Sequence, residues 1–214
     1  MFFPYKDDNP RILFPFVTYT IIGINSLVFI YQYFILPPEL LSHIISTYAL
    51  TPAAPSVITV FTSMFMHGGL MHIIFNMWFL WIFGDNIESV LGHKRYVLFY
   101  LLCGVGAALA QIQINTASQI PMVGASGAIA GVLGAYLIRF PRATVHVLVI
   151  LIIFITFIRV PAMVVIGIWF LSNLTAGLGT LGIEETGGTA WFAHLGGFVS
   201  GVVLNQVFKQ IRIE

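Results

Sequence analysis

The sequence predicts an all-α, polytopic membrane protein, because it carries too few polar residues to cover the surface of a soluble domain. Of its 214 residues, 58% are hydrophobic and 8% are charged, whereas about 25% are charged in an ordinary soluble domain. These values exclude a soluble enzyme, a disordered chain and a nucleic-acid binder, which would need a basic surface. The formal net charge of +1 indicates nothing about partners. The single cysteine, Cys103, allows no internal disulfide. We expect one domain, residues 1–214, with a single helical core.

Six apolar stretches predict a six-transmembrane-helix bundle, since a spanning helix needs about 20 mostly apolar residues. The predicted spans are 12–36, 57–84, 96–114, 126–139, 160–178 and 191–208. The first ends at Pro37-Pro38, and it is too long for the core of a signal peptide, so we expect no cleavage. The fourth has 13 residues before Arg139, which is about 20 Å of helix against a hydrocarbon core of about 30 Å. Its first residue should therefore lie below the outer surface, in a water-filled recess.

The basic residues predict the orientation, because Lys and Arg collect in short cytoplasmic loops. With six spans and a cytoplasmic N-terminus, all 9 basic residues fall on that side. They are Lys6, Arg11, Lys94, Arg95, Arg139, Arg142, Arg159, Lys209 and Arg212. The segment 143–158 is apolar and rich in β-branched residues, but as a seventh span it would put the last two basic residues outside. We therefore expect this segment to lie at the cytoplasmic interface or to fold back, with both termini cytoplasmic.

Ionisable side chains inside a span are costly, so each one is a hypothesis about function. His72 and Asn76 are four residues apart and share one face of the second predicted span. His67 precedes them, and the helical period puts it about 140° away from His72. The alternative is that these groups only join helices by hydrogen bonds, as polar residues in spans often do.

Ser126 lies where a loop becomes a helix, in the sequence Gly124-Ala125-Ser126-Gly127. The glycines allow a tight turn and the close approach of another backbone. A helix N-terminus provides free N–H groups and the positive end of the dipole, and both favour a developing oxyanion. The alternative is helix packing, because Gly127 and Gly131 form a GxxxG pair.

His194 lies in the last predicted span beside a row of small residues. Ala193, Gly197 and Gly201 are spaced by four, and they form one smooth helix face. A lone histidine in a span is more often a packing or relay group than a catalytic base. The small residues shift that balance, because they let another backbone come within hydrogen-bond reach.

Together these groups predict a Ser–His dyad. A serine hydroxyl is a weak nucleophile until a base takes its proton, and His194 is the candidate base for Ser126. His72 and Asn76 would donate hydrogen bonds to the oxyanion alongside the backbone N–H of Ser126.

No acidic residue lies inside a predicted span, so we expect no third member of the triad type. The closest acids, Asp85 and Glu88, fall beyond the inner end of the second predicted span. No cofactor or metal is needed, and the sequence lacks an HExxH motif with its glutamate base.

With these residues in place, the sequence resembles the rhomboid family of intramembrane serine proteases over nearly the whole chain. The matching positions are His67, His72 and Asn76, then Gly124, Ser126 and Gly127, then Glu88 and Gly92, and finally Ala193, His194, Gly197 and Gly201. The resemblance implies that Ser126 is the nucleophile and His194 the general base. His72 and Asn76 would complete the oxyanion hole, and Glu88 would have a structural role that ties the inner loop together.

The resemblance also implies hydrolysis of peptide bonds in or near transmembrane segments, at small residues with helix-destabilising neighbours. The fifth span and the outer cap from Ser172 to Ala190 are candidate gates, because 5 glycines make that stretch yielding. Two features depart from the family. Many members carry an aromatic residue one turn after the serine, where this chain has Ala130, and the loop 37–56 has no Trp-Arg pair.

Two other functions compete with the protease. A rhomboid-like pseudoprotease would bind membrane clients without cutting them, but such proteins usually lack the serine or the histidine. A small transporter or channel would place an acidic partner inside the spans. The expected partners are the lipid bilayer and transmembrane substrates, with no nucleic acid. A bacterial or archaeal cell membrane suits the chain best, and the oligomeric state is open.

Overall fold

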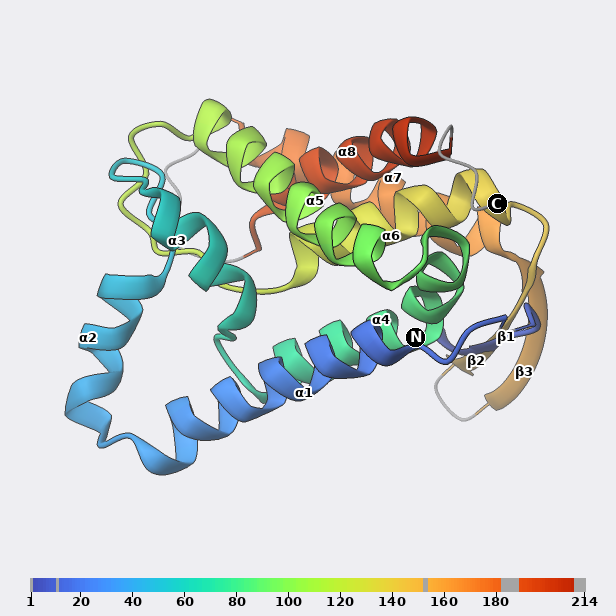
Figure 1. Ribbon diagram of the computed structural model, residues 1–214, viewed down its shortest axis with the longest axis horizontal. Helices are drawn as coiled ribbons and strands as arrows, with labels where there is room; N and C mark the ends of the chain where they lie inside the picture. Colours follow the sequence, from blue (N-terminus) through green and yellow to red (C-terminus); the bar gives the residue numbers. More distant parts are fainter. Residues whose placement is uncertain (1, 11, 152–153, 182–188, 210–214) are drawn as a thin grey trace.

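The structure is a computed structural model that describes residues 2–10, 12–151, 154–181 and 189–209. Helices lie side by side in a bundle, with a small sheet at one end (Figure 1). The elements in order are β1 Phe2–Asp7, α1 Phe16–Ile30, η1 Tyr31–Ile35, α2 Pro38–Tyr48, α3 Val57–Thr62, η2 Ser63–Phe65, α4 Leu70–Leu91, α5 His93–Ile114, α6 Ser126–Arg139, β2 Thr144–Leu151, β3 Phe154–Pro161, α7 Ala162–Thr180 and α8 Trp191–Lys209.

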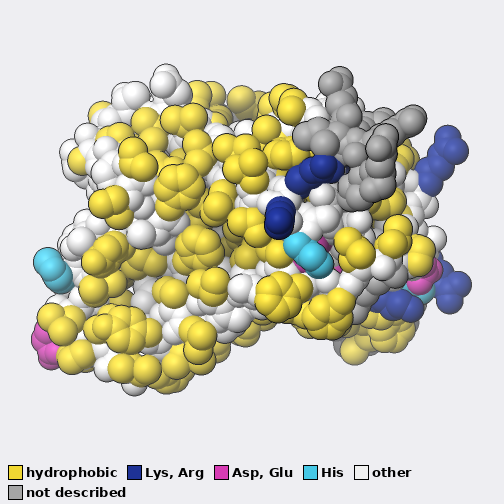
Figure 2. All heavy atoms as spheres, viewed as in Figure 1, with side chains coloured by type: hydrophobic (Ala, Val, Ile, Leu, Met, Phe, Trp, Pro, Cys, Tyr) yellow, Lys and Arg dark blue, Asp and Glu magenta, His cyan; other side chains and the backbone are white. Residues whose placement is uncertain are grey.

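The bundle has the length and the apolar exterior that a bilayer requires. Four helical segments of the described chain are long and apolar enough to cross a membrane, namely Phe16–Ile35, α4, α5 and α7. Helix α6 is shorter, with 14 residues, and residues 127–136 within it are all buried. Hydrophobic side chains cover most of the face seen in Figure 2. The predicted class, a polytopic helical membrane protein, is confirmed, whereas the count of six spans stays a prediction.

The predicted bounds of the second span, 57–84, are wrong. Residues 57–62 form the separate helix α3, which begins where the Ser56 side chain accepts a hydrogen bond from the Thr59 N–H at 3.1 Å. Helix α4 begins only at Leu70 and continues to Leu91. The other five predicted spans differ from the observed helices by at most four residues at either end.

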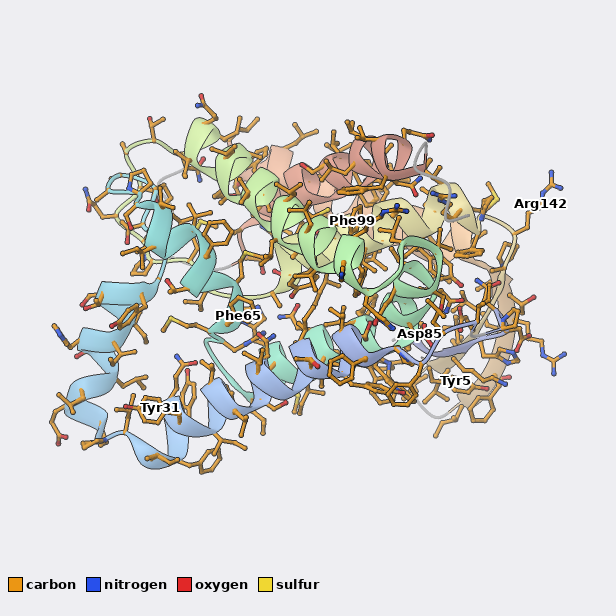
Figure 3. All side chains as sticks on the ribbon, viewed as in Figure 1. Tyr5, Tyr31, Phe65, Asp85, Phe99 and Arg142 are labelled. Atoms are coloured by element: carbon orange, nitrogen blue, oxygen red, sulfur yellow. The ribbon has the colours of Figure 1, made fainter. Side chains whose placement is uncertain are left out.

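The longer α4 also corrects the placement of the two acids. Asp85 and Glu88 lie inside α4 and are buried, rather than beyond its end. The helix can bury them because their oxygens have hydrogen-bond partners, which for Asp85 include the Asn86 side chain at 2.7 Å. Figure 3 places Asp85 near the start of α1, towards the sheet and away from the beginning of α6.

The segment 143–158 folds back as an antiparallel hairpin of β2 and β3, and β1 pairs with β2 on the other side. The side chains of Val145, Val147 and Val149 are buried, one residue in two, as the period of a strand requires. The all-α prediction did not include this sheet. It lies at the end of the bundle where α1 begins and α6 ends (Figure 1), and Arg142 projects away from that end (Figure 3).

Helices α6 and α8 are in backbone contact through glycines. A Cβ atom built on Gly197 would overlap the carbonyl oxygen of Gly127, and one on Gly201 would overlap the carbonyl oxygen of Gly131. On its other side, Gly131 lies directly against the side chain of Cys103 in α5. Small residues let membrane helices approach closely enough for dense packing and interhelical polar contacts. The GxxxG glycines and the small row of the last span therefore pack against each other.

Glu88 acts as the cap of α1 from outside that helix. Pro15, the residue before α1, provides no side-chain cap. The Glu88 carboxylate instead accepts hydrogen bonds from the backbone N–H groups of Val17 and Thr18, each at 2.8 Å, and from the Thr18 hydroxyl at 2.7 Å. His93 Nδ1, at the start of α5, lies 2.6 Å from Glu88 Oε1. A carboxylate at a helix N-terminus satisfies free donors and complements the dipole, so Glu88 joins α1, α4 and α5.

Replacing Gly201 by Ala should destabilise the fold. The added methyl overlaps the Gly131 backbone, so α6 and α8 must separate, at a cost of about 1–3 kcal/mol in the free energy of unfolding. Thermal unfolding in detergent measures this loss. The matched control is Gly23→Ala in α1, where a Cβ meets nothing within 4 Å, and helix propensity there favours Ala by up to about 1 kcal/mol. Equal stability of the two variants would contradict the close contact.

Replacing Glu88 by Ala should lower the free energy of unfolding by about 2–4 kcal/mol, since it leaves buried donors of α1 without an acceptor. Chemical unfolding in mixed detergent micelles measures the change. Glu39→Ala, which removes an exposed carboxylate from the first turn of α2, is the control and should cost less than about 1 kcal/mol. A Glu88 variant as stable as the Glu39 variant would contradict the role of Glu88 as the cap of α1.

Candidate active site

The segment before α6 is fixed by backbone hydrogen bonds to the loop that follows α2 and to η2. Leu50 and Met122 form an antiparallel bridge, with N–H to O distances of 3.0 and 2.8 Å. The Gly124 N–H donates to the Ser63 carbonyl at 2.9 Å. Gly124 has φ +134°, and a Cβ there would lie 2.7 Å from the His72 ring. Only glycine fits both the backbone conformation and the close ring, and the next turn begins α6 at Ser126.

The structure brings Ser126 and His194 together. Helix α8 begins at Trp191, and the Ala193 N–H in its first turn donates to Gln111 Oε1 of α5 at 3.1 Å. The glycine contact between α6 and α8 places the first turns of both helices side by side. Ser126 Oγ lies 2.8 Å from His194 Nε2. Both side chains are half-buried and line one cavity of about 990 Å³.

Asn173 contacts the other side of the His194 ring, a contact that the sequence did not predict. Its Oδ1 lies 2.5 Å from His194 Nδ1, and its Nδ2 donates to the Trp169 carbonyl at 2.7 Å. Asn173 is 4% exposed. The signal that could have found it is a lone amide in the otherwise apolar fifth span, the same signal that selected Asn76 in the second.

Two tryptophan rings pack against the His194 ring, and neither comes from the position one turn after the serine where many rhomboids have an aromatic residue. The Trp169 ring of α7 lies 5.8 Å from the His194 ring, and the Trp191 ring of α8 lies 6.2 Å from it, edge on. Ala130, which stands where many rhomboids have an aromatic residue, is fully buried in α6. The aromatic contact to the histidine therefore comes from α7 and α8 instead of α6.

His72 and Asn76 line the same cavity as Ser126 and His194. Asn76 is 6% exposed, and its Nδ2 has no hydrogen-bond partner among the described residues. A buried amide donor without a partner is costly, and here it borders a cavity that can hold a ligand oxygen or water.

The predicted position of His67 on the helix of His72 is wrong. His67 precedes α4, in the extended segment between η2 and Leu70, because Gly68 and Gly69 interrupt the helical run. Its ring packs edge-on against the His72 ring at 5.1 Å, and its backbone N–H donates to Gln32 Oε1 at 3.3 Å. His67 is therefore a buried neighbour of His72 rather than a side chain on another face of α4.

The predicted gate, the fifth span with the stretch from Ser172 to Ala190, is partly helical in the structure. Residues 172–180 belong to α7, so Gly177 and Gly179 lie within a helix. Gly182, Gly187 and Gly188 fall outside the described residues. Among the residues that the structure describes, no three His, Cys, Asp or Glu side chains are grouped so that they could hold a metal ion.

The fold and the site together define a multi-pass helical membrane protein with a hydrogen-bonded serine–histidine pair beside a cavity. The family model of the rhomboid domain matches residues 54–210. The chain therefore belongs to the rhomboid family, and the resemblance seen in its motifs is confirmed.

Relatives with this domain come from distant organisms. RHOMBOID-like protein 1 of Arabidopsis thaliana is 32% identical over 148 residues, which are 69% of this chain and 33% of that protein. The presenilin-associated rhomboid-like protein A, mitochondrial, of Danio rerio is 33% identical over 90 residues, 41% of this chain and 24% of that protein. The rhomboid protease GluP of Bacillus subtilis is 40% identical over 76 residues, 36% of this chain and 14% of that protein. The chain thus matches a third or less of the length of these relatives.

Proposed function

We propose that the chain is an intramembrane serine endopeptidase that hydrolyses peptide bonds in or near the transmembrane segments of membrane proteins. The observation that carries the proposal is the 2.8 Å contact between Ser126 Oγ and His194 Nε2, beside a cavity and at the N-terminus of α6. A relative that bears the name protease, GluP of Bacillus subtilis, supports it.

The proposed reaction uses groups that already border the cavity. Ser126 Oγ attacks the carbonyl carbon of the scissile bond, and its proton passes to His194 Nε2. The oxyanion that forms accepts hydrogen bonds from the Ser126 N–H, Asn76 Nδ2 and the His72 ring. His194 then gives its proton to the leaving amine, and water hydrolyses the acyl-enzyme with His194 again as the base.

The free N–H groups of the first turn of α6 suit the negative charge of this intermediate. They have no partner within the helix, and the positive end of the helix dipole lies beside them. The oxyanion in this proposal is thus stabilised by neutral donors only, which avoids burying a permanent charge inside the membrane.

The substrate in this proposal is a transmembrane helix that unwinds near small residues. The backbone carbonyls of an intact helix accept hydrogen bonds within the helix, so an attack requires local unwinding. The cavity wall includes Trp169 of α7 and Trp191 of α8, so a substrate segment that reaches Ser126 would pass close to these rings.

We further propose that both termini are cytoplasmic, with Ser126 opening towards the outer side. The Lys and Arg side chains visible in Figure 2 gather over the half of the molecule that carries the sheet, and none of the described ones is visible over α2 in that view. Basic residues collect on the cytoplasmic side of membrane proteins. The relatives come from a plant, an animal and a bacterium, so a prokaryotic cell membrane stays a prediction.

Purified protein in lipid should react covalently with a fluorophosphonate probe and should cleave a test transmembrane substrate. Ser126→Ala should abolish labelling and reduce cleavage on the order of 10³-fold or more, since the nucleophile is lost. The control Ser46→Ala changes an exposed serine of α2 that bonds only to its own helix and should leave both unchanged. Cleavage by the Ser126 variant would refute the dyad, and a native protein that binds clients but neither labels nor cleaves would favour a pseudoprotease.

Replacing Asn76 by Leu should lower kcat about 10²- to 10³-fold with little change in KM, because an oxyanion donor acts in the transition state and not on the bound substrate. Steady-state kinetics on the test substrate measure both constants. Ile74→Leu, at an exposed position of α4 that does not line the cavity, is the matched control. A variant with unchanged kcat would show that Asn76 does not stabilise the oxyanion.

A further inference from the structure

We propose that Asn173 is a positioning residue for the general base, so that α7 contributes a neutral third member to a hydrogen-bonded chain of Ser126, His194 and Asn173. The proposal rests on the proposed serine protease function and deepens it. The sequence predicts only a dyad, because it lacks an acid in the right place, and the structure shows what faces the second nitrogen of the histidine.

The hydrogen bonds of the Asn173 side chain determine which of its atoms faces the histidine. Its Nδ2 lies 2.7 Å from the Trp169 carbonyl oxygen, which only accepts. The opposite assignment of the amide would put two oxygens in contact, so Nδ2 is the donor to Trp169. Oδ1 is then the atom that lies 2.5 Å from His194 Nδ1. A carbonyl oxygen cannot donate, so Nδ1 carries the hydrogen.

This assignment prepares His194 for its role as a base. A neutral imidazole has one donor nitrogen and one acceptor nitrogen. With the hydrogen on Nδ1, Nε2 is left to accept from the Ser126 hydroxyl at 2.8 Å. When His194 takes up the serine proton, the Nδ1–H keeps its bond to Asn173, so the ring need not turn during the reaction. The carboxylate of the Ser-His-Asp triad orients its histidine in the same way.

A neutral amide suits this position better than a carboxylate would. Asn173 is 4% exposed inside a predicted span, and an ionised group buried there would carry a large desolvation cost. The amide satisfies both of its contacts within the protein and adds no charge. It therefore orients the base at a depth where an aspartate would be costly.

Both the acceptor and one flanking ring for His194 come from the same helix. Asn173 and Trp169 are one turn apart in α7, and the Trp169 ring packs 5.8 Å from the His194 ring. The orientation of His194 thus depends on α7 staying against α8. A displacement of α7 would remove the hydrogen-bond acceptor and the ring contact together.

The test compares two variants that each remove one hydrogen bond to the Trp169 carbonyl. Asn173→Leu keeps a branched side chain of similar shape and removes both polar atoms. Ser172→Ala removes the neighbouring hydroxyl, which donates to the same carbonyl at 2.7 Å but is exposed and does not contact His194. We expect Asn173→Leu to lower kcat and the rate of fluorophosphonate labelling about 10- to 100-fold, with KM unchanged. Ser172→Ala should match the native protein.

Rescue separates a positioning role from a packing role. Asn173→Asp restores an oxygen at the place of Oδ1 without a buried charge when its carboxyl is protonated, because the O–H then donates to the Trp169 carbonyl in place of Nδ2. This variant should recover at least a tenth of the native kcat. Thermal unfolding in detergent should show that all variants remain folded. Histidine ¹⁵N spectra should show Nδ1 protonated in the native protein and a mixture of tautomers in Asn173→Leu.

The outcomes distinguish this inference from the proposed function. If the native protein reacts with the probe and Asn173→Leu reacts at the same rate, Asn173 has no positioning role and the inference is overturned. A folded Asn173→Leu with raised KM and native kcat would overturn it too. If the native protein itself neither labels nor cleaves, the protease function fails first.

Discussion

The close contact of α6 with α8 is the constraint on which the rest of the site depends. Gly197 and Gly201 leave no room for a side chain against the carbonyls of Gly127 and Gly131. A distance of 2.8 Å between a serine and a histidine on different helices requires this backbone contact, because both side chains are short. The packing alternative and the catalytic interpretation of these glycines are therefore not rivals, since packing is the means by which the serine meets its base.

The distribution of polar groups follows the cost of burying charge. The buried carboxylate of Glu88 lies at the sheet end of the bundle, where backbone N–H groups and a histidine surround it. At the cavity, the structure uses neutral groups, namely a hydroxyl, amides and imidazoles. Neutral hydrogen-bonding groups need fewer compensating partners in a medium of low dielectric than ions do. With Glu88 away from the cavity, the site contains hydrogen-bonding groups without a buried carboxylate. A chain in which 8% of the residues are charged can therefore contain this site inside a bilayer.

The outcomes for the individual segments show where sequence reasoning succeeds. The length of apolar runs located most helices closely, since the thickness of the bilayer sets that length. It failed at 57–84, because α3 and α4 are both apolar and the break at Gly68-Gly69 changes direction without changing hydropathy. It also missed the strands in 143–158. In β2, residues 145–150 alternate between buried and half-buried side chains. Residues 147–150 are apolar on both faces, so no alternation is visible there in the sequence.

Composition and motif spacing were enough to establish the membrane class, the rhomboid family and the pairing of Ser126 with His194 as a hypothesis. These follow from local patterns and from the few polar residues that an apolar chain contains. The partners of His194 on its other side, Asn173 and Trp169, came only from the arrangement of α7 against α8. No spacing in the sequence relates residues that far apart, because helix packing sets which faces meet, and that depends on the shape of the whole bundle.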